Sequence, residues 1–250
     1  MTEPPADTFL FEIPAPPTPV ERLLLLAGQY TLHNDTLDLG LAASTDPDPA
    51  THVASARRLA SETSTAINAV IDQQPYINPD LSDALVRLSQ LAYLSAQSGR
   101  DPRMARDLTA LAPEAIVNSA ARIAQELGHG RSGASTAPKE HLTPLHCLAL
   151  YEIARGHVVV TESVDRQYVH SRGIRVLIST VRHLESHGLI DRAGGSAAPA
   201  FEGGPPQDRV RLTPAGVTAV ASFIGLPSAS TSTPTGVVPP SPIQPPSRSR

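Results

Sequence analysis

The chain has 250 residues, a formal net charge of −4 and a single cysteine, Cys147, so it can form neither an internal disulfide nor a metal cluster held by several cysteines. No apolar run approaches the roughly 20 residues that span a bilayer, and the first residues lack the basic start of a secretion signal. We therefore expect a cytoplasmic protein of one or two domains that does not bind a membrane. Its single lysine among 20 positive residues indicates a bacterial genome of high GC content.

A proline-rich start precedes a long helical region. Residues 1–19 hold too many prolines for a helix and are expected to be disordered, although segment 9–13 could dock as a strand or short linear element. From residue 20 to 128 apolar side chains recur at helical spacing, without strand-like alternation. The predicted helices cover residues 21–41 (with potential interruptions at Gly28 and 33–35), 50–73, 80–97, 101–111 and 114–127. We expect a helical bundle, a domain over residues 20–128 that serves dimerisation or effector sensing.

Residues 129–138 are predicted to be a flexible linker because glycine, serine and alanine dominate them. Glycines at 128, 130 and 133 match the G-x-G-x-x-G pattern of dinucleotide-binding loops. Such a loop needs a strand before it and a helix after it, whereas here a predicted helix precedes and Ser-Thr-Ala-Pro follows. A nucleotide site is not expected.

The chain after the linker alternates between helices and strands. A helix is predicted from the Thr143-Pro144 cap to about residue 155, followed by a strand at 158–161 and by a second helix, or an irregular version of it, at 162–171. A third helix starts between 172 and 179 and ends near His187. Paired strands at 189–192 and 209–212 and a last helix at 214–224 complete this part. Gly188 is expected to end the third helix in a left-handed cap. We predict a disordered tail over residues 226–250.

Charge is distributed unevenly along the chain. Residues 1–138 carry a formal charge of −7, residues 139–224 carry +1 with six of the nine histidines, and the tail carries +2. Between Asp165 and Glu185 there are four arginines, two histidines and no acidic residue. Such a run can neutralise phosphates and gain free energy from the release of counterions, which favours nucleic acid as a partner.

Three motifs in this part resemble the winged helix-turn-helix domain of MarR-like regulators. They are Leu142-Thr-Pro-Leu-His-Cys-Leu-Ala-Leu150, Leu184-Glu-Ser-His-Gly188-Leu-Ile190 and Asp208-Arg-Val-Arg-Leu-Thr-Pro-Ala-Gly216. The resemblance covers about residues 139–224, roughly a third of the chain, and predicts a winged helix-turn-helix domain over residues 139–225. It implies a first helix, a recognition helix, a wing with a small two- or three-stranded sheet, and a closing helix. The family has a longer, cleaner helix between the first and the recognition helix than residues 162–171 offer. The expected fold is mainly α: an N-terminal helical bundle plus a C-terminal winged helix of the α+β class.

A winged helix lays one helix in the major groove of duplex DNA and places basic wing residues on the flanking backbone. The predicted DNA-binding residues are Arg166, His170, Arg172, Arg175, Ser179, Thr180, Arg182, His183, Arg192, Arg209 and Arg211. Ser179, Thr180, Arg182 and His183 are expected to face base edges or nearby phosphates, and the last three arginines to contact phosphates from the wing. The alternative for each arginine is a salt bridge to Glu152, Glu162 or Glu185 on a solvated face.

Other chemistry finds little support. His183 and His187 have the spacing of a helical metal pair, but H-E-x-x-H is absent and His187 better fits a cation at the helix end. Cys147 has apolar neighbours and is expected to be a buried packing residue. We find no nucleophile elbow and no paired carboxylates, so we expect no enzymatic activity, no cofactor and no metal.

These patterns predict a transcriptional regulator that binds double-stranded DNA as a homodimer, since paired half-sites need a two-fold protein. A small-molecule effector is left open. One alternative is a winged helix that acts as a protein–protein module in a replication, partition or other assembly. Another is an enzymatic or ligand-processing role of the N-terminal domain.

Overall fold

The computed structural model describes residues 16–43, 49–74, 76, 78–99, 101–128, 142–163 and 166–226. Its helices and strands, in chain order, are α1 (Pro19–Ala42), α2 (Pro49–Gln73), α3 (Pro79–Gln97), α4 (Pro102–Thr109), α5 (Ala112–Glu126), α6 (Pro144–Ala154), β1 (Val159–Ser163), β2 (Arg166–His170), α7 (Ile178–Ser186), β3 (Ile190–Ala197), β4 (Gln207–Leu212) and α8 (Pro214–Phe223). The fold is mainly helical with one small antiparallel sheet, as the α+β expectation required. The described helices include none long and apolar enough to cross a membrane.

Several helices start with a polar capping residue followed by proline. The side chains of Thr18, Asn78, Asp101, Thr143 and Thr213 each accept a hydrogen bond from a backbone N–H of the first turn. Proline follows at the first helical position, where its missing N–H costs nothing. This repeated pattern explains why the predicted starts of these five helices lie within two residues of the observed ones. Residues 16–19, predicted to be disordered, contain one of these starts.

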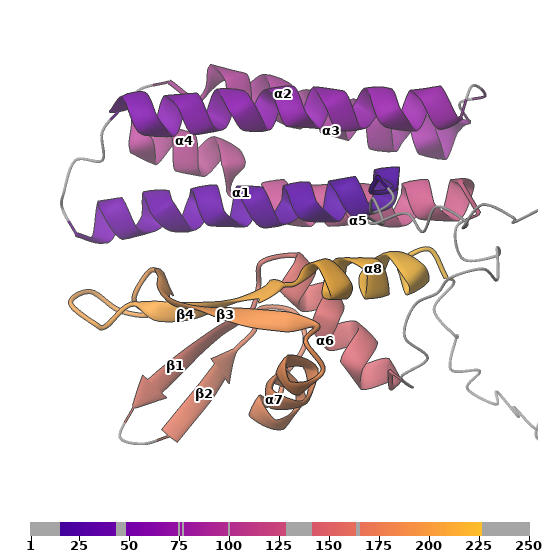
Figure 1. Ribbon diagram of the computed structural model, residues 1–250. Helices are drawn as coiled ribbons and strands as arrows, with labels where there is room; N and C mark the ends of the chain where they lie inside the picture. Colours follow the sequence, from indigo (N-terminus) through magenta and orange to yellow (C-terminus); the bar gives the residue numbers. More distant parts are fainter. Residues whose placement is uncertain are drawn as a thin grey trace, which may run out of the picture.

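The elements form three layers (Figure 1). Helices α2, α3 and α4 lie on one side of the central pair α1 and α5, and the sheet with α6, α7 and α8 lies on the other side. One continuous hydrophobic cluster runs through the layers, from Leu23 and Leu88 in the helical half to Leu150 and Val210 beyond it. The two parts of the chain therefore share a core, and both α1 and α5 contact the C-terminal part.

Helix α1 is unbroken, so the potential interruptions at Gly28 and residues 33–35 do not occur. The polar side chains of His33, Asn34 and Asp35 are buried and find partners on other elements. Asn34 Nδ2 donates to the carbonyl of Thr109 at 2.8 Å, and its Oδ1 accepts from the Thr109 hydroxyl at 2.6 Å. Polar side chains of this kind would weaken an isolated helix, but here they form hydrogen bonds with groups on other elements.

His33 should make the fold sensitive to acid. Its Nδ1 lies 3.0 Å from Ser55 Oγ, and burial, with smaller contributions from the charges of His52 and Arg106, lowers its pKa from 6.5 to about 4. The unfolded chain takes up a proton near pH 6.5 while the folded chain does not, so stability falls as the pH drops from there toward 4. We expect a loss of about 1–2 kcal/mol between about pH 7 and pH 5. Urea unfolding of the wild type and of His33→Gln at both pH values tests this: equal pH dependence in the two proteins would refute it.

The sheet has four strands, not the expected two or three, because β2 adds to it; the strand order is β2-β1-β4-β3, all antiparallel. The predicted pairing of residues 189–192 with 209–212 is confirmed, since Ile190 pairs with Leu212 and Ala193 with Arg209. The predicted helix over residues 162–171 is wrong, because this segment ends β1 and forms β2. Exposure alternates along β2, where every second side chain from Arg166 to His170 points to solvent, and that is the period of a strand.

Gly188 has a φ of 66°, and the Leu189 N–H donates to the carbonyl of Leu184 at 3.0 Å. This confirms the predicted left-handed cap at the end of α7. The predicted segment 9–13, the linker 129–138 and the tail from 227 onward lie outside the described residues, as do Gly130 and Gly133 of the glycine motif.

Candidate functional site

The predicted acid-free run forms an exposed basic surface made by β2, residues 171–177 and α7. The exposed predicted residues are Arg166, His170, Arg172, Arg175, Ser179, Arg182 and His183. They lie in the layer of the sheet and α7, on the side of the α1–α5 pair opposite to α2 and α3 (Figure 1). We call this set the basic surface.

The arginines of the basic surface have no carboxylate partner among the described residues. Within the described part of the chain, Arg166, Arg172, Arg175 and Arg182 form no ion pair with a carboxylate. Arg182 Nη2 donates to Gln167 Oε1 at 3.1 Å, but that amide is neutral. These four cations are therefore free to pair with anions from outside the chain.

Thr180 does not belong to this surface. Helix α7 begins at Ile178, which turns Thr180, Val181 and Leu184 toward the core, and Thr180 is 5% exposed. The expectation that it faces base edges is wrong.

Two of the wing arginines are held by carboxylates, and the third is half-buried. Arg192 Nη2 lies 2.7 Å from Glu185 Oε2, which is the salt-bridge alternative considered for it. Arg209 donates from Nε and Nη2 to the two carboxylate oxygens of Asp35 at 3.0 and 2.5 Å. Two nitrogens of Arg211 are buried without a hydrogen-bond partner in the described residues. None of the three offers the open guanidinium that the predicted phosphate contacts require.

Asp35 joins the helical half to the sheet. It lies on α1 and is 2% exposed, while Arg209 lies on β4 and also donates from Nη1 to the carbonyl of Gly156 at 2.6 Å. Burial raises the pKa of Asp35, whereas the hydrogen bond and charge of Arg209 and the charge of Arg211 oppose that rise. A bidentate pair of this kind is geometrically specific, so it fixes how α1 meets β4.

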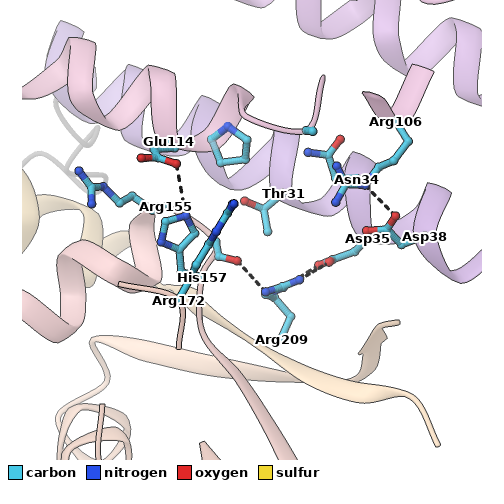
Figure 2. Close-up of a pocket in the computed structure, with 13 residues that line it drawn as sticks. Thr31, Asn34, Asp35, Asp38, Arg106, Glu114, Arg155, His157, Arg172 and Arg209 are labelled. Atoms are coloured by element: carbon cyan, nitrogen blue, oxygen red, sulfur yellow. Dashed lines mark hydrogen bonds and ion pairs between the residues drawn. The ribbon is translucent and has the colours of Figure 1, made fainter. Parts of the chain in front are cut away.

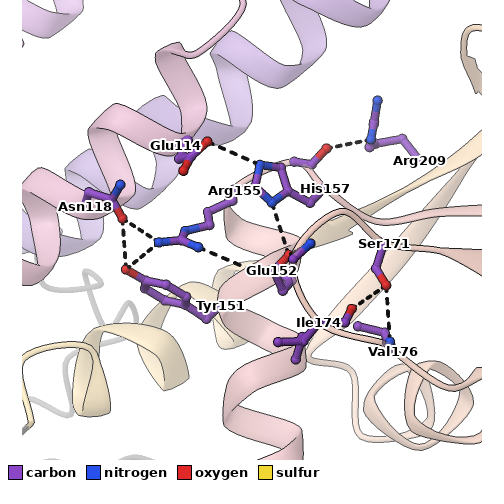
Figure 3. Close-up of polar contacts among 12 residues, drawn as sticks. Glu114, Asn118, Tyr151, Glu152, Arg155, His157, Ser171, Ile174, Val176 and Arg209 are labelled. Carbon is purple, nitrogen blue, oxygen red and sulfur yellow. Dashed lines mark hydrogen bonds and ion pairs between the residues drawn. The ribbon is translucent and has the colours of Figure 1, made fainter. Parts of the chain in front are cut away.

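Glu152 on α6 anchors the segment that leads into α7 (Figure 3). Its carboxylate, 3% exposed, accepts hydrogen bonds from Arg155 Nη1 at 3.3 Å and from the Gly173 N–H at 3.0 Å, and lies 3.1 Å from His157 Nδ1. A Cβ on Gly173 would lie 2.7 Å from that carboxylate, so a larger residue there would displace the Glu152 side chain. Glu152 therefore positions the part of the basic surface that includes Arg172 and Arg175.

A local turn continues this positioning. The Ser171 hydroxyl donates to the carbonyl of Ile174 at 2.5 Å and accepts from the Val176 N–H at 3.2 Å (Figure 3). Val176 is buried, whereas Arg175 before it is exposed. The turn thus decides which side chain of residues 171–177 faces solvent.

Three histidine rings lie against one another where α6 meets α7. The ring centroids of His146 and His183 are 4.4 Å apart, and those of His183 and His187 are 4.2 Å apart. Burial, followed by the charges of the other two rings, lowers the pKa of His146. Among the described residues, no group of three or more His, Cys, Asp or Glu is arranged to hold a metal ion. Cys147 is half-buried, and burial raises its pKa, which makes it a poor nucleophile.

A polar cavity of about 220 Å³ lies where α1, α4 and α5 face the sheet (Figure 2). Its lining includes Asp35, Arg106, His157, Arg172 and Arg209, of which Arg172 and Arg209 were predicted site residues. The sequence carried one signal for it: buried helices seldom hold three consecutive polar residues such as 33–35 without a partner elsewhere. Comparison with protein-family models, curated proteins and solved structures finds no match.

Proposed function

We propose that the protein is a DNA-binding transcriptional regulator whose C-terminal part acts as a winged helix. The observation that carries this proposal is the basic surface, with four arginines that no carboxylate of the described chain neutralises. Charge of this kind is the electrostatic footprint of phosphate binding. In this proposal α6 is the first helix, α7 the recognition helix and the β3–β4 hairpin the wing, while β2 takes the place of the usual second helix.

The proposed contacts divide by position. Ser179, Arg182 and His183 are exposed on α7 and read base edges in the major groove. Arg166 on β2 and Arg175 before α7 contact phosphates and set the register of the protein on the duplex. Arg192 and Arg209 hold the wing in place through their carboxylate partners. The acidic helical half supplies dimerisation or effector sensing.

A protein–protein module remains the second candidate because apolar side chains are exposed beside the basic surface. Leu145 and Leu148 on α6 and Leu177 before α7 are 45%, 50% and 44% exposed. Clustered exposed leucines are typical of surfaces that bind a partner. The two candidates differ in salt dependence, since apolar contacts are little affected by salt whereas phosphate contacts weaken steeply.

Fluorescence anisotropy with random-sequence duplex DNA, repeated at several salt concentrations, tests the proposal. We expect binding that weakens steeply with salt, and an Arg166→Ala/Arg175→Ala variant whose slope of log K against log salt is smaller by about 2, one for each proposed phosphate contact removed. Arg57→Ala/Arg87→Ala is the matched control, because it removes the same charge from exposed positions on α2 and α3.

Circular dichroism should show that both variants are folded. Equal loss of DNA binding in the two variants would mean that binding depends on the net charge of the protein, and it would contradict the assignment of DNA contacts to the basic surface. Absence of binding at low salt by the folded wild type would refute the regulator proposal and favour the protein partner.

A further inference from the structure

The cavity between the helical half and the sheet is lined by charged side chains from both (Figure 2). Asp38 and Arg106 come from α1 and α4, Glu114 from α5, and Arg172 from the segment that leads to α7. Its volume of about 220 Å³ is below the roughly 300–1,000 Å³ of sites for drug-sized ligands, so an occupant would be small.

Hydrogen-bond donors in the cavity exceed what the chain itself uses. Arg209 commits its donors to Asp35 and Gly156. Arg106, by contrast, donates only from Nε, to Asp38 Oδ1 at 2.7 Å, so its two terminal nitrogens have no partner in the described chain. Arg172 has no hydrogen-bond partner there at all.

Ion pairs account for three of the four arginines that line the cavity. Arg106 pairs with Asp38, Arg209 with Asp35, and Arg155 with Glu152 beside the cavity, whereas Arg172 has no ion pair among the described residues. The charge of Arg172 and the unused terminal nitrogens of Arg106 match the planar oxygens of a carboxylate or the oxygens of a phosphate.

We propose that this cavity is a binding site for a small anion that carries carboxylate or phosphate oxygens, held by Arg106 and Arg172. A bound anion would tie Arg172, and with it residues 171–177, to α4 of the helical half. Since the same segment presents Arg175, the anion would change how the basic surface is presented. This regulatory role rests on the proposed DNA binding, whereas the site itself does not.

The test is thermal unfolding of the full chain without DNA, titrated with inorganic phosphate or with succinate while sodium chloride keeps the ionic strength constant. A ligand that binds only the folded chain raises the unfolding midpoint by about 5–10 °C at about 100 times its Kd. The two probes distinguish the two kinds of ligand: tighter binding of inorganic phosphate indicates a site for phosphate groups, and tighter binding of succinate indicates a site for carboxylates.

Arg106→Gln and Arg172→Gln should each weaken the binding of the preferred anion at least about tenfold. Their matched controls are Arg103→Gln, exposed on the same helix as Arg106, and Arg175→Gln, exposed in the same segment as Arg172. Both lie outside the cavity and should bind as the wild type does. Arg172→Gln breaks no hydrogen bond of the described fold, so it tests the site even if Arg106→Gln is unstable.

No saturable stabilisation by either anion, or equal stabilisation of the cavity variants and their controls, would overturn the site. Anisotropy with and without the preferred anion then tests the regulatory role. Saturable anion binding by a protein that does not bind DNA would leave the site in place and refute only the proposed function.

Discussion

Replacing Asp35 with alanine should lower the free energy of unfolding by about 3–5 kcal/mol, one of the two largest effects we expect from a single substitution. Arg209 would keep its charge in a half-buried position without either of its hydrogen bonds to the carboxylate, and the charge of Arg211 lies close by. Denaturation by urea, followed by circular dichroism, measures the change. The same variant should loosen the attachment of β4 to α1 and weaken DNA binding if the proposed wing depends on it.

Two further variants show whether the cost arises from the buried charge. Asp35→Ala/Arg209→Met removes both charges and should recover a large part of the lost stability, because an apolar pair avoids the unpaired cation. Asp38→Ala breaks a more exposed pair with Arg106, whose side chains are 29% and 28% accessible, and should cost no more than about 1 kcal/mol. If Asp35→Ala and Asp38→Ala lowered the free energy of unfolding by similar amounts, burial of the Asp35–Arg209 pair could not be the cause of the loss.

Local signals predicted the helices well because their physical causes are local. Asn78-Pro79 and Thr143-Pro144 specify a cap and a first turn without help from the rest of the chain. Gly188 likewise ends α7 through its own backbone freedom. Strand β2 was missed because its alternation spans only five residues, too short a run to outweigh the helix that the resemblance led us to expect there.

The candidate site shows where local reasoning stops. The run between Asp165 and Glu185 could be recognised as cationic, and its exposure agrees with that, but contact with DNA stays a prediction. The orientation of Thr180 depends on the residue at which α7 begins, and a shift of one position rotates every side chain by about 100°. The Asp35–Arg209 pair joins residues 174 positions apart, so no local pattern could reveal it.

Gly216 should tolerate no side chain, because α8 begins directly against the turn between α7 and β3. A Cβ at this position would lie 1.9 Å from the carbonyl oxygen of Leu189, and both groups are backbone or attached to it. Thr213 reinforces the contact, since its hydroxyl donates to the Gly188 carbonyl at 2.6 Å and its N–H to the Leu189 carbonyl at 3.1 Å. The Thr-Pro-Ala-Gly sequence at residues 213–216 therefore attaches the start of α8 to the turn at the end of α7.

We expect Gly216→Ala to cost about 3 kcal/mol or more, since a packed interior cannot absorb a methyl group against a backbone carbonyl. Gly28→Ala is a control of opposite sign: a Cβ there meets nothing within 4 Å in the middle of α1, so it should stabilise by about 0.5–1 kcal/mol. Urea unfolding of both variants measures the two values. Because the displaced α8 would carry the Gly188 turn with it, Gly216→Ala at permissive temperature should also weaken DNA binding through α7, whereas Gly28→Ala should not. A Gly216→Ala protein as stable as the wild type would mean that α8 does not meet this turn as closely as 1.9 Å implies.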